Sequence, residues 1–157
     1  MPFYQKRGDI PDKRHIQFKD ADGNLFWEEL ISRQGFSHMY SNVYHINPPT
    51  TIKEIDEQIK NEIKFFSKAN KHYHLKTSEI NCKGDAISSR TPLFFNQDLA
   101  VSKCHIDKSM KDLFKNAYSD EILFIHSGEG ILDTNFGYLN LSQGDYIVIP
   151  RGVIWKI

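Results

Sequence analysis

The sequence predicts a mostly-β domain of the jelly-roll type, with an N-terminal β-rich arm and one amphipathic helix. Short apolar runs rich in β-branched and aromatic residues alternate with turn clusters of Gly, Asn and Ser, above all in residues 121–157. Residues 52–69 have the three- and four-residue apolar spacing of a helix. The chain has 157 residues and a hydrophobic fraction of 39%, enough for one globular domain, so we expect residues 1–157 to fold as one.

Composition limits the classes of partner. Lys and Arg number 20, as do Asp and Glu, and a net charge of zero argues against nucleic acid or an anionic membrane surface. No apolar run is long enough to cross a bilayer, and residues 1–10 lack the apolar core of a secretory signal, so we expect a cytoplasmic protein. A disulfide between Cys82 and Cys104 stays open, but reduced cysteines are the preferred interpretation.

Residues 1–50 are expected to form an irregular, β-rich arm. The turn residues Asp22-Gly23-Asn24, between Phe18 and the apolar residues 25–27, predict a hairpin. Residues 35–47 alternate aromatic or apolar with polar side chains, which predicts a strand. The two prolines at 48 and 49 should end that strand.

Residues 51–70 contain the expected helix. Thr51 and Glu54 have the spacing of a capping box, and Asn70 is a suitable C-cap. The opposite face is polar, so we expect a solvated helix lying on a sheet. The apolar stripe consists of Ile52, Ile55, Ile59, Ile63 and Phe66.

Residues 71–157 are expected to consist of short strands. Strand candidates occupy residues 72–80, 91–97 and 99–106, whereas residues 108–118 suit a helical turn or a loop. The clearest strands are predicted at 122–125, 139–141 and 146–149.

Two spacings in the last 37 residues resemble the paired signatures of cupins, which are small β-barrels. One runs from Glu121 over six residues to Gly128. The other runs from Gly144 over five residues to Pro-Arg-Gly at 150–152, and then over two residues to Trp155. The resemblance implies a double-stranded β-helix, here an incomplete barrel. We expect Gly128 and Gly144 to lie in tight turns with positive φ.

The ligand positions of a cupin metal site are mostly lost in this chain. Such a site needs two His in a His-x-His pair, a carboxylate and a third His, a set suited to Fe(II), Mn or Zn. Trp155 stands where the last His belongs, and only Glu121 remains. We therefore predict a cupin fold without the metal, and assign no catalytic, cofactor-binding or metal-binding residue in this chain. The two possible placements of the His-x-His pair fall on Lys115 and Ala117, or on Phe114 and Asn116.

One other stretch could form half of a metal site. His72, His74 and Glu79 have the signature spacing, and both histidines would share one face of a strand. The glycine that should follow the Glu is replaced by Ala86. We therefore favour surface or subunit-contact histidines over metal ligands.

The remaining histidines are given structural roles. His45 precedes two prolines and is expected to be buried or in an interface, with a hydrogen-bonded ring. His126 alternates with Phe124, which leaves a barrel-interior position open. His38 has no partner nearby in sequence. A basic cluster, expected on a solvated or subunit-contact face with an anion site as the lesser alternative, consists of Lys13, Arg14 and His15.

The sequence gives no support for nucleophilic catalysis or phosphate binding. Cys104 and His105 resemble a nucleophile and base in composition, but adjacent strand residues point to opposite faces. The sequence has no Gly-rich phosphate loop, GxSxG or CxxC motif.

Seven segments together resemble the N-terminal part of bacterial homogentisate 1,2-dioxygenase, in order and over essentially the whole chain. The most specific are YHINPPT at 44–50 and GDYIVIPRG at 144–152. The others are YQKRGDIPDKRHIQF, DADGNLFWEEL, QGFS, RTPLFFNQD and YSDEILFIHSGEGIL.

The resemblance implies an enzyme that uses Fe(II) and O2 to open the ring of homogentisate, giving maleylacetoacetate in tyrosine and phenylalanine breakdown. It also implies a trimer or a pair of trimers. Family iron is held by two His and one Glu in the C-terminal half, so no ligand transfers to a position here, and this chain alone is expected to bind no cofactor and to be inactive. Family members commonly have His where this chain has Asn47.

We expect the chain to be the N-terminal part of a longer, two-barrel dioxygenase. It stops two residues after Trp155, and a barrel ending there would leave open apolar edges. The alternative is a metal-free cupin module that binds a small molecule or a partner.

Overall fold

The computed structural model describes residues 17–56 and 72–157. The chain divides into two compact units, an N-terminal unit of Met1–Ile55 and a C-terminal unit of Asp56–Ile157.

The N-terminal unit contains one antiparallel pair of strands, β1 (Trp27–Ser32) and β2 (Tyr40–His45). The strand predicted within residues 35–47 is therefore confirmed. Before β1 the predicted hairpin also forms, because Lys19 pairs with Leu25 in an antiparallel bridge.

The turn of this hairpin is held by the carboxylate of Asp20. Its Oδ1 accepts hydrogen bonds from the backbone N–H groups of Asp22, at 2.9 Å, and Asn24, at 2.8 Å. The Asn24 side-chain amide donates to Oδ2 at 3.1 Å. These bonds, the Asn24 side chain first among them, lower the pKa of Asp20 because they favour the ionised carboxylate. An aspartate three residues before the glycine, Asp20 before Gly23, therefore fixes the turn.

The start of the predicted helix does not form. Residues 51–56 have no helical structure, so the capping box of Thr51 and Glu54 is wrong. Ile52 and Ile55 are exposed, and a short helix whose apolar stripe is not buried has little to stabilise it. The rest of the predicted stripe and the Asn70 cap lie outside the described residues.

The C-terminal unit is built from short strands, which confirms the mostly-β prediction. The stretch 72–80 is an exception: it holds a 3-10 helix, η1 (Thr77–Glu79), and no strand. The loop alternative for residues 108–118 holds apart from a two-residue strand. The strands are β3 (Lys83–Gly84), β4 (Thr91–Phe95), β5 (Ala100–Lys103), β6 (His105–Ile106), β7 (Phe114–Lys115), β8 (Glu121–Phe124), β9 (Gly130–Thr134), β10 (Gly137–Leu141), β11 (Tyr146–Ile149) and β12 (Ile154–Lys156).

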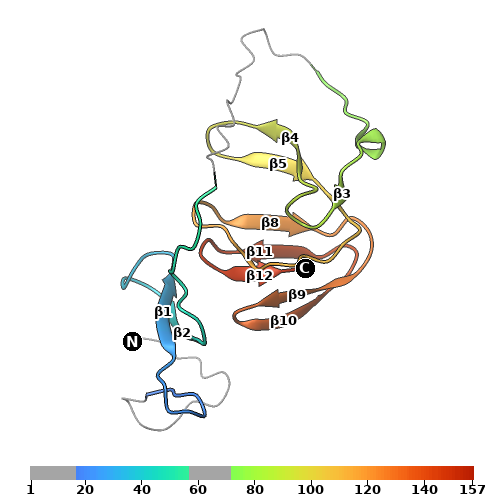
Figure 1. Ribbon diagram of the computed structural model, residues 1–157. Helices are drawn as coiled ribbons and strands as arrows, with labels where there is room; N and C mark the ends of the chain where they lie inside the picture. The colour runs from blue at the N-terminus through green and yellow to red at the C-terminus, as the bar shows by residue number, and fades with distance from the viewer. Residues whose placement is uncertain (1–16, 57–71) are drawn as a thin grey trace. The chain divides into compact units, whose positions relative to one another are not determined.

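The strands of this unit form small sheets that do not close on themselves (Figure 1). The largest has the order β10-β9-β12-β7, and β11 pairs with β8 in antiparallel register. β4 pairs antiparallel with β5, whereas β3 and β6 run parallel. This arrangement confirms an incomplete barrel.

The core lies in the C-terminal unit and follows the period-two pattern of its strands. In β11, Ile147 and Ile149 are buried while Tyr146 and Val148 are exposed. The largest fully buried side chains among the described residues are Trp155 and Leu132. The signature glycines occupy turns as expected, with φ of +88° at Gly128 and +95° at Gly144.

Leu132 provides a direct test of this core. Replacing Leu132, which is 1% exposed, with Ala should lower the free energy of unfolding by about 2–5 kcal/mol, because it leaves a cavity. Leu139 lies opposite it on β10 but is 55% exposed, so Leu139→Ala should cost about 0.5 kcal/mol or less. Urea denaturation of the two variants checks the contrast. Equal losses would show that Leu132 is not in the core.

Candidate functional site

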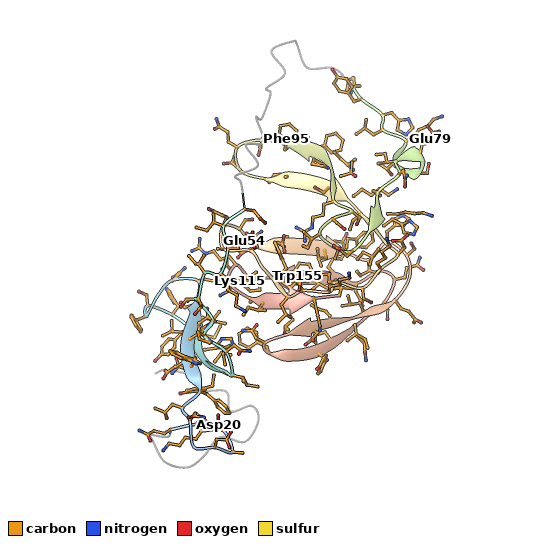
Figure 2. All side chains as sticks on the ribbon, in the orientation of Figure 1. Asp20, Glu54, Glu79, Phe95, Lys115 and Trp155 are labelled. Carbon is orange, nitrogen blue, oxygen red and sulfur yellow. The ribbon has the colours of Figure 1, made fainter. Side chains whose placement is uncertain are left out.

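The cupin signature positions come together in the interior of the C-terminal unit. Glu121 begins β8, and Trp155 in β12 pairs with Phe114 in β7. The rings of Phe114 and Trp155 meet edge to face with centroids 5.6 Å apart, and the Asn116 amide donates to Glu121 Oε1 at 3.3 Å. Of the two placements left open by the sequence, the structure therefore favours Phe114 and Asn116. Figure 2 shows Trp155 among the strands of this unit.

An arginine that the sequence analysis did not single out lies between these residues. Arg90 Nη1 donates to Glu121 Oε1 at 2.5 Å. Its guanidinium carbon lies 5.6 Å from the ring centroid of Phe114 and 5.8 Å from that of Trp155, within range of a cation–π interaction. A fixed cation on a side chain thus contacts three positions where a metal cupin would carry its ligands.

The turn before β4 positions Arg90. Asp85 Oδ1 accepts hydrogen bonds from the backbone N–H groups of Ile87, at 2.9 Å, and Ser88, at 2.8 Å. These bonds, that from Ser88 first, lower the pKa of Asp85. Arg90 Nε then donates to the Ala86 carbonyl at 2.9 Å. The turn and the hydrogen bond to Ala86 together direct the guanidinium of Arg90 toward Glu121.

The ion pair is shielded from water but is not fully satisfied. The Glu121 side chain is 10% exposed and that of Arg90 is 28% exposed. Arg90 Nη2, Glu121 Oε2 and Trp155 Nε1 are buried without a hydrogen-bond partner. The residues of the site therefore leave two hydrogen-bond donors, Arg90 Nη2 and Trp155 Nε1, and one acceptor, Glu121 Oε2, without a partner.

These residues do not fit a metal ion. The carboxylate of Glu121 is already neutralised by Arg90, and its other neighbours are two aromatic rings and an amide. Across residues 17–56 and 72–157, no group of three or more His, Cys, Asp or Glu side chains could hold a metal.

The alternative ligand set does not assemble. His72 and His74 are exposed and lie outside any strand, so the shared strand face predicted for them is wrong. Glu79 lies in η1, on the outside of the unit, and its carboxylate is 3.8 Å from Lys76 Nζ (Figure 2). Although His72, His74 and Glu79 have the signature spacing, no strand holds them, and their side chains do not meet at one site.

Two other histidine predictions have opposite outcomes. His45 is partly buried and its Nε2 lies 2.8 Å from Glu29 Oε2, which confirms a hydrogen-bonded structural ring. The interior position suggested for His126 is wrong. The inward-facing residues of this segment are Glu121, Leu123 and Ile125, so His126 faces outward. There its ring meets the ring of exposed Phe124 edge to face.

The other candidates are placed without a site. His38 and His105 are exposed, and the basic cluster at residues 13–15 lies outside the described residues. Cys82 and Cys104 are free thiols, the first buried and the second exposed. In the described part of the chain, no helix is long and apolar enough to span a membrane.

Residues 33–157 match the family described as homogentisate 1,2-dioxygenase N-terminal. The chain belongs to this family. No solved structure matches the chain.

A relative from Saccharolobus solfataricus supports the same family. It is named "putative dioxygenase" and is 39% identical over 159 residues. The match covers 100% of this chain but 41% of the relative. The chain thus spans about two fifths of the length of this curated relative.

The Arg90–Glu121 pair can be tested by a double-mutant cycle. Arg90→Met leaves Glu121 buried without its counter-charge and should cost about 3 kcal/mol of unfolding free energy. The double variant Arg90→Met/Glu121→Leu should cost clearly less than the sum of the single changes, because it removes both charges. Urea denaturation measures all three.

A solvated ion pair provides the control for this cycle. Lys76 and Glu79 are 69% and 73% exposed, so Lys76→Met should cost no more than about 1 kcal/mol. Additive losses for Arg90 and Glu121 would mean that the two side chains do not interact.

Proposed function

We propose that the chain is the metal-free N-terminal part of a homogentisate 1,2-dioxygenase. The complete enzyme would open the ring of homogentisate with O2 to give maleylacetoacetate, in tyrosine and phenylalanine breakdown. Membership of the family supports the dioxygenase class. The observation that supports a non-catalytic role for this part is the contact of Arg90 with Glu121, at the position where a cupin would bind its metal.

Iron and substrate would therefore be held outside this chain. This chain matches only 41% of its S. solfataricus relative, which leaves most of that protein for a second part. On the resemblance, two His and one Glu there would hold Fe(II), and a further His would lie near the substrate. The assembly proposed on the same basis is a trimer or a pair of trimers, with the protein in the cytoplasm.

The chain's own work would be structural, through an apolar face on the β8–β11 pair. Two cross-strand pairs, Ile122 with Val148 and Phe124 with Tyr146, are all exposed in this unit. The rings of Phe124 and Tyr146 lie 4.6 Å apart and extend the face. A continuous exposed apolar face is typical of a surface that packs against another. We assign it to the iron-bearing second part.

Iron content and ring cleavage test the division of labour. The complete natural gene product should contain iron and convert homogentisate, whereas the chain of residues 1–157 should do neither. Glu121→Gln in the complete product should leave the ratio of iron to protein unchanged, because Glu121 faces Arg90 and not a metal. Elemental analysis and an assay for maleylacetoacetate measure these outcomes.

Two results would contradict the proposal. Iron bound by residues 1–157 and lost in Glu121→Gln would place a metal in this unit. A complete gene product with neither iron nor ring-cleaving activity would instead favour a metal-free cupin module that binds a small molecule or a partner.

Polar substitutions on the β8–β11 face test its packing role. Ile122→Ser/Val148→Ser should lower the melting temperature of the complete product more than that of residues 1–157, because only the complete product buries these side chains. The matched control is Ile131→Ser/Leu139→Ser, which changes exposed apolar residues of β9 and β10. Equal shifts in the two proteins would show that the second part does not cover this face.

A further inference from the structure

The parallel pair of β3 and β6 brings the two cysteines to matching positions. Lys83 lies opposite His105, and Gly84 opposite Ile106. The backbone N–H of His105 donates to the carbonyl of Cys82 at 3.0 Å, and that of Asp107 donates to Gly84 at 3.0 Å. One step back along this ladder, Cys82 stands opposite Cys104.

This placement satisfies the geometric requirement of a disulfide. Neighbouring strands lie about 4.8 Å apart. Bridged cysteines have Cα atoms about 4.4–6.8 Å apart. Residues opposite one another in a ladder also direct their side chains to the same side of the sheet. Cys82 is 5% exposed, so its thiol is shielded, whereas Cys104 is an exposed residue whose side chain is partly desolvated.

We propose that Cys82 and Cys104 form an oxidisable pair that closes to an intramolecular disulfide when the protein meets a hydroperoxide. The Cys104 thiolate takes one oxygen from hydrogen peroxide, giving a sulfenic acid and one water after proton transfer. The Cys82 sulfur then attacks the sulfenic sulfur, the S–S bond forms, and a second water leaves. In total two thiols lose two electrons and two protons, and one peroxide becomes two waters.

The surroundings of Cys104 determine the pH dependence of this step. Loss of hydration raises the pKa of the Cys104 thiol, opposed by the nearby Arg90 guanidinium and reinforced by the Cys82 thiol. The other ionisable groups on this ladder are Lys83 and His105. Because the thiolate is the nucleophile, oxidation should be slow at neutral pH and should accelerate as the pH rises toward the raised pKa.

Peptide mapping after peroxide treatment tests the pair. Residues 1–157 are treated with hydrogen peroxide at neutral pH and at about pH 9, alkylated, and digested without reductant. The expected product is one cross-linked peptide joining Cys82 to Cys104, formed faster at the higher pH and lost on reduction. The oxidised chain should melt at a higher temperature than the reduced one, since the bridge restricts the unfolded chain.

Matched variants and an unfolded control make the result decisive. Cys82→Ser and Cys104→Ser should each abolish the cross-link, and Cys104→Ser supplies this control from an exposed position even if Cys82→Ser fails to fold. In urea the wild-type cross-link should form more slowly. The proposal is overturned if both thiols stay alkylatable, if Cys104 stops at the sulfenic or sulfinic acid, if disulfide-linked dimers form instead, or if the unfolded chain cross-links equally fast.

Discussion

Two opposite charges, Arg90 and Glu121, meet in the interior of the C-terminal unit, and four segments depend on that contact. Burying two ions costs several kcal/mol each unless the geometry and the remaining hydrogen bonds are good. The structure meets part of that cost with a 2.5 Å contact, a bond from Arg90 Nε to Ala86, and the ring faces of Phe114 and Trp155. Removing either charge would therefore disrupt the contacts that join the turn before β4 to β7, β8 and β12.

This ion pair also accounts for the missing ligands of the cupin signature. A metal site needs several donors because a bare cation must be surrounded, whereas a guanidinium carries its charge on a side chain and needs one carboxylate and flat neighbours. Phe114 and Trp155 provide those neighbours. Once Arg90 supplies the cation, histidines at these positions have no ion to bind. The carboxylate at 121 is held by Arg90 instead.

The strands of residues 121–157 could be predicted from sequence because their alternation and their turn glycines are local features. Arg90 could not, because its role depends on β7, β8 and β12, which lie 24 or more residues further along the chain. The only local signal was a single arginine before the apolar run TPLFF. The His-x-His placement was undecided for a similar reason: a one-residue shift reverses the face of a strand, and only pairing with Trp155 fixes it. The strand predicted at residues 72–80 does not form, and among the described strands none pairs with this stretch.

The same period-two rule links the interior charge pair to the outer apolar face. In β8, Glu121 and Leu123 point inward, as does Ile125 directly after it, which forces Ile122 and Phe124 outward. A slip of one residue against β11 would exchange Leu123 and Ile125 for Ile122 and Phe124 in the interior, which changes little in apolar burial. It would also move Glu121 outward and leave Arg90 buried without its partner. The ion pair therefore fixes the register in which Ile122, Phe124, Tyr146 and Val148 remain on the surface. The outward position of this apolar face is therefore set by the same register that buries the ion pair.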